Sequence, residues 1–166
     1  FATGNQLPAV LPKKAEYVMK DIRRMAKYCQ VPLSLPKDIL DTVVVKGSLP
    51  AMRFITAVDI AEPQFLEPVS RELWMRVWSR DEDIVQPESI LAAAEKAGLP
   101  SGKSQELLKM SSSAEVKNRL KETTDEALKF GAFGVPCFVI QIDGKPQLFF
   151  GSDRVEVLGS FLGECY

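Results

Sequence analysis

The segment GAFGVPCFVI, residues 131–140, constrains the fold of this chain more than any other stretch. Pro136 has no N–H to donate to a sheet, so it fits only an edge strand, a bulge or the first residue of a strand. Phe138, Val139 and Ile140 follow as three consecutive apolar residues, a pattern typical of a strand buried on both faces. Such burial needs a sheet of more than two strands.

The residues after Pro136 predict a β-hairpin and a helix. The β-rich runs PCFVIQID and PQLFFG are separated by Asp143-Gly144, a dipeptide typical of hairpin turns. SDRVEVLGSFLG then predicts a helix with Ser152 or Asp153 as its N-cap. No other strand is predicted in the chain. We therefore expect the missing strands to come from a partner or from a segment before Phe1, with a βαβ unit of about 30 or more residues as the natural size.

Helical periodicity dominates the rest of the chain, after an expected loop or tail at 1–14. Ser48 is expected to cap one helix, and Pro87 with Gly98 brackets another. Trp74 and Trp78 lie four residues apart, which favours packing in the core over a cofactor site. A short helix is expected after Pro36. Longer helices are predicted over 15–29, 48–60, 62–84, 87–100, 101–113 and 113–132. The last of these has an apolar stripe that comprises Val116, Leu120, Thr124, Ala127 and Leu128.

Charge and hydropathy exclude two classes of partner. The chain has 21 basic and 22 acidic residues, well mixed along its 166 positions. No basic run is long enough for a nucleic-acid groove or an anionic membrane surface, so no nucleic-acid partner is expected. No window approaches the roughly 18 apolar residues of a membrane span, so none is predicted.

Cysteine and histidine content excludes several kinds of chemistry. Cys29, Cys137 and Cys165 are far apart, odd in number and include no C-x-x-C pair, which argues against a disulfide framework and indicates a reducing compartment. Histidine is absent, so no Ser-His-Asp or Cys-His arrangement can form, and no metal site is expected. Any general base is a carboxylate, Lys, Tyr or a group that the substrate brings.

The order helix, G-x-P, strand, turn, strand, helix resembles the second half of a thioredoxin fold, in which the Pro is cis and lies beside the active site. Four stretches in succession, ELWMRVWSRDEDI, SILAAAEKAGL, KETTDEALKFGAFGVP and FGSDR, resemble the kappa-class glutathione transferases, which are related to DsbA and to 2-hydroxychromene-2-carboxylate isomerases. The resemblance implies an α/β fold, a thioredoxin-like domain with a large inserted all-helical domain. It assigns 1–14 to a loop of the thioredoxin-like domain, 15–128 to the insertion and 129–166 to the C-terminal helix–hairpin–helix part.

The resemblance also implies glutathione as co-substrate. The cis turn at Pro136 leaves the N–H and C=O of Val135 free to pair with the cysteinyl backbone of glutathione, as in recognition of an extended peptide. Ser152 and Asp153 suit the γ-glutamyl group, through free N–H groups at a helix start and the Asp carboxylate. Simple helix capping is the alternative role for both, and the two roles are compatible.

Two further contacts are implied near the N-terminus, each with a structural alternative. Asn5 matches a family residue that contacts glutathione, and an ordinary turn Asn is the alternative. Lys14 matches a charge near the glycyl carboxylate, and a solvated surface Lys is the alternative.

Cys137 departs from the family pattern, and we favour a buried strand residue over a redox role. Arg154 is left without an assigned role.

The expected activity is conjugation of the glutathione thiolate to small electrophiles by a homodimer. The catalytic Ser of the family lies in a Ser-Pro-Tyr-Ser-like stretch that would precede Phe1, so no catalytic residue is assigned in this chain. The alternatives are a glutathione-dependent isomerase of the 2-hydroxychromene-2-carboxylate type and a truncated chain that binds glutathione or a partner without turnover. The resemblance points to mitochondria or peroxisomes, although the terminal GECY is not an S-K-L-type signal.

Overall fold

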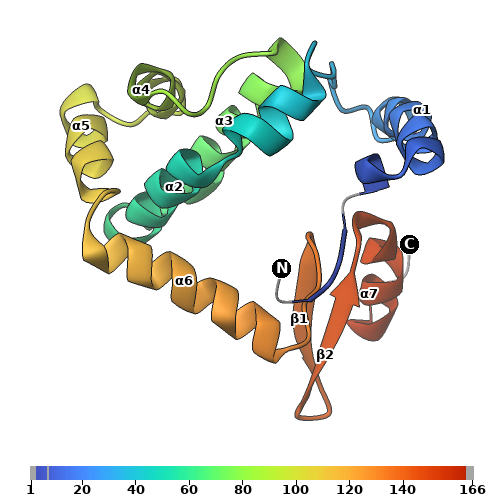
Figure 1. The fold of residues 1–166 in the computed structure, drawn as a ribbon. Helices are drawn as coiled ribbons and strands as arrows, with labels where there is room; N and C mark the ends of the chain where they lie inside the picture. Colours follow the sequence, from blue (N-terminus) through green and yellow to red (C-terminus); the bar gives the residue numbers. More distant parts are fainter. Residues whose placement is uncertain (1–2, 7, 164–166) are drawn as a thin grey trace.

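The structure, a computed structural model, describes residues 3–6 and 8–163. Helices fill most of the described chain, and a β-hairpin and a short helix follow them (Figure 1). The elements are α1 Pro12–Tyr28, α2 Leu49–Ala61, α3 Leu66–Arg80, α4 Pro87–Lys96, α5 Ser101–Met110, α6 Ala114–Lys129, β1 Cys137–Ile142, β2 Lys145–Phe150 and α7 Val155–Phe161. Shorter turns are 3-10 helical at Pro8–Val10, Pro63–Phe65 and Ser152–Arg154, and π-helical at Asp41–Lys46, where a short helix is expected.

The hydrophobic core lies within a helical body formed by α2 to α5 and the start of α6. Each of α2 to α5 buries residues spaced three or four apart, because that spacing places them on one face. Ala93 and Ala94 are small enough to let α4 pack closely between α3 and α5. The buried apolar cluster comprises Ala51, Phe54, Ala57, Val58, Val69, Leu73, Ile90, Ala93, Ala94, Leu99, Leu107 and Val116.

The prediction that Trp74 packs in the core is wrong. α3 buries Val69, Leu73 and Val77, which follow one another at four-residue steps. Trp74 lies about 100° around the helix from Leu73, since an α-helix has 3.6 residues per turn, and its side chain is 58% exposed. Trp78 is partly buried.

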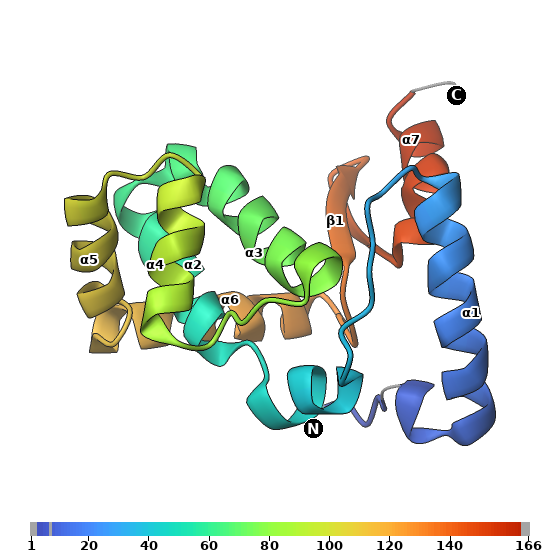
Figure 2. The ribbon, with the colours of Figure 1, turned by 90° about the horizontal axis from the view of Figure 1, so that it is seen from above.

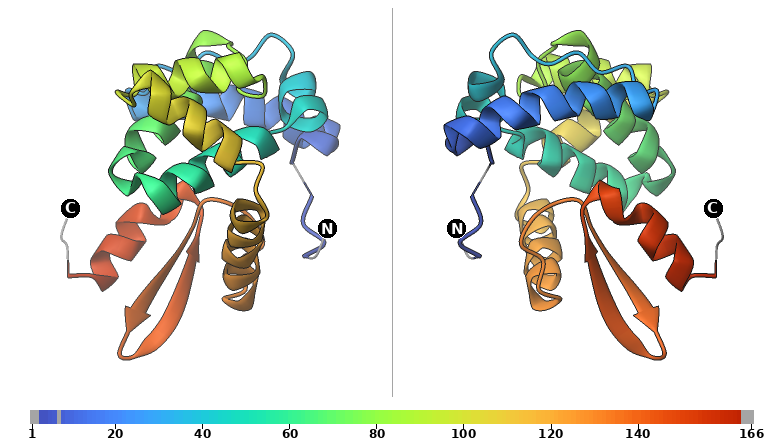
Figure 3. Two further views of the ribbon diagram at one scale, coloured as in Figure 1. Left: turned by 90° about the vertical axis from the view of Figure 1, so that its left-hand side faces the viewer. Right: turned by 90° about the vertical axis from the view of Figure 1, so that its right-hand side faces the viewer.

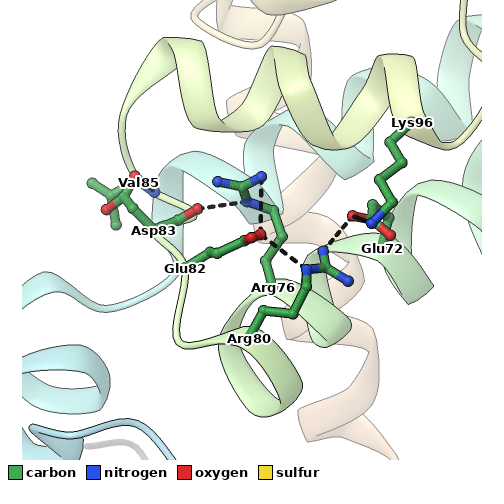
Figure 4. Close-up of polar contacts among 7 residues, drawn as sticks. All are labelled: Glu72, Arg76, Arg80, Glu82, Asp83, Val85 and Lys96. Carbon is green, nitrogen blue, oxygen red and sulfur yellow. Dashed lines mark hydrogen bonds and ion pairs between the residues drawn. The ribbon is translucent and has the colours of Figure 1, made fainter.

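A network of charged side chains connects α3 to α4 and to the segment between them (Figure 4). Glu72 accepts a hydrogen bond from Arg80 and lies 3.3 Å from the Lys96 ammonium. Arg80 also donates to Glu82, at 3.0 Å. Arg76 donates through Nε to the backbone carbonyl of Asp83, at 2.8 Å, and pairs with Glu82. The network holds the α3–α4 connection, and we assign it a structural role.

The N-terminal residues differ from the expected loop. Pro8–Val10 forms a 3-10 turn, and α1 begins at Pro12, with Pro in the first turn where its missing N–H costs no hydrogen bond. α1 contributes no buried side chain and lies to one side of the helical body (Figure 2). The following link is tied to α3 by a 2.6 Å hydrogen bond from Ser34 N–H to Trp78 O. No helix in the described ranges is both long and apolar enough to cross a membrane.

The hairpin is confirmed, and it projects away from the helical body (Figure 3). Cys137 pairs with Phe150 and Ile142 with Lys145 in antiparallel register. Asp143 and Gly144 have φ of 50° and 72°, as expected for the central residues of a type I′ turn. Within residues 3–6 and 8–163 the sheet has these two strands, so β1 is not buried on both faces, and Val139 is 37% exposed.

Two details of the helix predictions are also corrected. Ser48 occupies the N-cap position of α2 but makes no side-chain capping bond. The predicted apolar stripe of α6 is buried only at Val116, because the start of the helix packs on α2 and the rest extends toward the hairpin (Figure 1). Farther along α6, Thr124 and Leu128 are exposed.

Candidate functional site

The end of α6 sets the path of the chain into residues 133–136. Gly131 has a left-handed φ of 86°, which a residue without Cβ adopts readily. Its N–H donates to Leu128 O at 2.9 Å, and the N–H of Ala132 donates to Ala127 O at 3.0 Å. This pair of bonds ends a helix at a left-handed glycine and turns the chain away from the helix axis.

The peptide bond between Val135 and Pro136 is cis, and we call residues 133–136 the cis-Pro loop. The side chain and backbone of Val135 project into solvent, with 87% of the residue exposed. Among the described residues, neither its N–H nor its C=O has a hydrogen-bond partner. Pro136 is held in place, since its carbonyl accepts the N–H of Gly151 at 3.0 Å. The loop therefore offers one free donor and one free acceptor to an extended ligand.

Asn5 contacts this loop from the other end of the sequence. Its side-chain Nδ2 donates to the carbonyl oxygen of Phe133 at 2.7 Å. The backbone N–H of Asn5 lies 3.4 Å from Thr3 Oγ1, a longer local contact. The structure thus brings Asn5 beside the residues that precede Val135.

Three residues that were not predicted from the sequence, Phe133, Gly134 and Phe150, pack together in or against the cis-Pro loop. The rings of Phe133 and Phe150 have centroids 4.5 Å apart, at an interplanar angle of 43°. A Cβ added at Gly134 would lie 2.8 Å from Phe150 Cε2 and 3.3 Å from Asn5 Nδ2, so only glycine fits there without movement. The signal in the sequence was the glycine itself, since a glycine between bulky residues often marks a close approach.

The prediction that Ser152 or Asp153 caps the last helix is wrong. Ser152–Arg154 forms a 3-10 turn, and α7 begins only at Val155, with Arg154 in the N-cap position and no side-chain capping bond. Gly151, with φ of 98°, turns the chain so that the Asp153 carboxylate folds back over it. Asp153 pairs with the Arg154 guanidinium at 3.2 Å instead of capping.

The candidate residues thus fall into two groups. Asn5 contacts the cis-Pro loop, and the bond from Gly151 to Pro136 places the Ser152–Arg154 turn next to it. Lys14 lies in the first turn of α1 and is exposed, and no hydrogen bond or ion pair in the described chain connects it to the others. Cys137, a free thiol at the start of β1, is partly buried, which is less than the burial expected for it.

Two hollows lie elsewhere on the molecule. One, of about 200 Å³, lies between residues 81–85 and the Lys46–Gly47 corner, and the other, of about 590 Å³, lies between the start of α2 and the middle of α6. Neither is lined by a candidate residue. In the part of the chain that the structure describes, no three cysteine or acidic side chains gather as ligands for a metal ion. The candidate site is an open backbone edge, since Val135 is 87% exposed.

Comparison with known proteins identifies similar chains. The family model of the DSBA-like thioredoxin domain matches residues 1–163. Human glutathione S-transferase kappa 1 is 51% identical over 162 residues, which are 98% of this chain and 72% of that protein. The Caenorhabditis elegans glutathione S-transferase kappa 2 is 36% identical, over 96% of this chain and 71% of that protein.

Solved structures show the same fold. A 2-hydroxychromene-2-carboxylate isomerase superposes with a TM-score of 0.70 at 25% identity, covering 96% of this chain and 71% of that one. A Nitrosomonas europaea protein described as a disulfide isomerase superposes with the same TM-score of 0.70 at 19% identity, over 92% of this chain and 74% of that one. The second likeness concerns the fold alone.

Proposed function

This chain belongs to the kappa class of glutathione S-transferases, with a DsbA-like thioredoxin fold, and we propose that glutathione binds along the backbone of Val135. The chain is accordingly a glutathione transferase. The isomerase alternative has weaker support, since identity is 25% to the isomerase and 51% to the human transferase.

The observation that carries the binding proposal is the free backbone of Val135. Its N–H and C=O have no partner among the described residues, although the peptide groups on either side of it are engaged. Phe133 O accepts from Asn5, and Pro136 O accepts from Gly151. A tripeptide laid along this edge satisfies both free groups, in the manner of an added strand.

The neighbouring turn supplies groups for the γ-glutamyl end of glutathione. Under the proposal the Asp153 carboxylate pairs with the γ-glutamyl ammonium, and the Ser152 hydroxyl and nearby N–H groups receive its carboxylate. Asn5 contacts glutathione through the part of its amide that Phe133 does not use. Lys14 would approach the glycyl carboxylate as a point charge, which requires α1 to lie along the bound ligand.

The chemistry of transfer fits a chain without histidine. The nucleophile is the thiolate of glutathione, so a lowered thiol pKa takes the place of a general base. The thiolate sulfur bonds to an electrophilic carbon, and the leaving group departs with the electron pair of its bond. The residues of the proposed site bind and orient glutathione, and the hydroxyl that stabilises the thiolate in the class is not assigned to any of them.

Assembly and location are proposed from the class. We propose a homodimer, supported by the exposed apolar side chains of Val155, Val157 and Phe161 on α7, which a second copy would cover. Light scattering at several concentrations measures the oligomeric state, and a monomer at all of them contradicts the proposed dimer.

Mitochondria or peroxisomes are the proposed compartments, to be tested by imaging a tagged protein in cells.

Calorimetric titration of the purified chain with glutathione tests the binding proposal. Asp153→Ala should weaken binding about tenfold or more, because a hydrogen-bonded charge pair typically contributes about 1.5 to 3 kcal/mol. Asp125→Ala is the matched control, since Asp125 is also in an ion pair but lies on α6 away from the loop. Val135→Ala should retain binding, because the proposed contact is made by backbone atoms. Unchanged affinity in Asp153→Ala, or no binding to the parent chain, would overturn the assignment.

A further inference from the structure

We propose that Phe150 is a positioning residue for glutathione: its ring fixes the direction in which Val135 presents its backbone. This inference rests on the proposed function and adds to it a residue that does not touch the ligand through its own polar atoms. Phe150 is the last residue of β2, and the turn that contains Asp153, Ser152–Arg154, follows after Gly151.

The ring of Phe150 contacts two successive residues of the cis-Pro loop. It packs on Phe133 with centroids 4.5 Å apart, which is within the range of a favourable aromatic pair. It also lies so close to Gly134 that an added Cβ would be 2.8 Å from Cε2 and 3.3 Å from Cζ. The aromatic ring of Phe150 therefore packs directly against Phe133 and Gly134 of the cis-Pro loop.

The other contacts of the loop act at its two ends. Asn5 holds the Phe133 carbonyl at 2.7 Å, and the N–H of Gly151 holds the Pro136 carbonyl at 3.0 Å. Between these bonds the Phe150 ring lies closest to Gly134, since an added Cβ would be 2.8 Å from Phe150 Cε2 and 3.3 Å from Asn5 Nδ2. Because the Val135 peptide has no bond of its own, its direction depends on this support. Binding is strongest when such a group is held in its bound orientation beforehand.

A double-mutant cycle with Gly134 and Phe150 tests the proposal. Phe150→Leu removes the aromatic ring that packs against the loop, and Gly134→Ala adds a methyl group that would clash with this ring and displace the loop. Each should weaken glutathione binding by about fivefold or more, as loss of preorganisation does. Because the Cβ added by Gly134→Ala would meet the ring that Leu lacks, the double variant should bind about as well as Phe150→Leu alone. Phe161→Leu is the matched control, since it breaks the other aromatic pair of this unit, Phe149 with Phe161 at 5.5 Å, without touching the loop.

A second measurement works without ligand. Residual dipolar couplings of the N–H bonds at 133–135 report bond orientation, so they separate a turned loop from a general loss of stability. They should change in Phe150→Leu and Gly134→Ala and stay constant in Phe161→Leu. Unchanged couplings in Phe150→Leu, or strictly additive losses of affinity in the cycle, would overturn the positioning role. If the parent chain does not bind glutathione, the proposed function fails for this ligand, and the couplings still decide whether Phe150 orients the loop.

Discussion

Asn5 and Phe133 lie 128 positions apart in the sequence and are joined by a hydrogen bond of 2.7 Å from the side-chain amide to the backbone carbonyl. The bond attaches the N-terminal segment to the cis-Pro loop, one residue before Gly134. It makes the position of this loop depend on residues at both ends of the chain.

Replacing Asn5 should therefore affect glutathione binding more than its exposed position suggests. Asn5→Ala is expected to weaken binding about two- to tenfold, the equivalent of a hydrogen bond with a net contribution of about 0.5 to 1.5 kcal/mol. Asn5→Asp should behave similarly, because an ionised carboxylate cannot donate to a carbonyl. Calorimetry measures both, with the exposed neighbour Gln6→Ala as the control. Equal affinities of Asn5→Asp and the parent chain would show that the amide N–H is not needed.

The two aromatic side chains Phe54 and Trp74 should differ sharply in their contribution to stability. Phe54 is fully buried in the helical core, so Phe54→Ala should lower the free energy of unfolding by about 3 to 5 kcal/mol. Trp74 is mostly exposed, so Trp74→Ala should lower it by less than about 1 kcal/mol. Urea unfolding followed by circular dichroism measures both without relying on tryptophan fluorescence. A large loss of unfolding free energy in Trp74→Ala would contradict this prediction and indicate that Trp74 packs in the core, as its spacing from Trp78 suggested.

Glu72 should be the most sensitive member of the charged network. Its side chain is only 12% exposed and meets both Arg80 and Lys96. Glu72→Gln removes the largely buried negative charge between the two cations and leaves Arg80 with Glu82 as its remaining acidic partner, and we expect a loss of about 1 to 3 kcal/mol in unfolding free energy. Glu67→Gln breaks an exposed pair with Arg71 on the same helix and should cost about 0.5 kcal/mol or less. Similar losses in the two variants would contradict a special role for the network.

Asp83 should make stability depend on acid pH. Burial favours its neutral form, but hydrogen bonds from the backbone N–H groups of Gln86 and Val85, at 2.7 and 2.9 Å, outweigh burial and lower the pKa of the carboxyl. A carboxyl whose folded pKa is lowered contributes stability that is complete above its unfolded pKa, about 3.9, and is lost as pH falls through the folded pKa.

Denaturant unfolding between pH 7 and pH 2.5 measures this dependence. Asp83→Asn should lower stability at neutral pH by about 1 kcal/mol, because the N–H groups of Val85 and Gln86 lose a charged acceptor, and should flatten the acid part of the profile. Asp81→Asn is the control, because Asp81 has a left-handed φ of 54° that Asn also adopts. An acid profile of Asp83→Asn that parallels the parent profile would contradict the prediction.

Residues that act locally were predictable. Pro87 and Gly98 mark the ends of α4, and Asp143-Gly144 forms the hairpin turn, because each depends on the dihedral preferences of one or two residues. The family was also readable from four short stretches, and the comparisons confirm it. Val135 was identified as a binding edge from the Pro that follows it, and its role stays a prediction.

Residues that act through neighbours distant in sequence were not predictable. Periodicity could not tell that Trp74 faces solvent, because that depends on where α2 and α4 cover α3. The pairing of Asp153 with Arg154 is a local exception: the letters FGSDR did not show it, because it depends on the left-handed φ that Gly151 adopts. The sequence by itself determined the hairpin, the main helices and the family, since these follow from local residue order. Only the tertiary structure decided that Asn5, Gly134 and Phe150 meet around one loop, because contacts between residues far apart in sequence, 128 positions for Asn5 and Phe133, leave no local pattern.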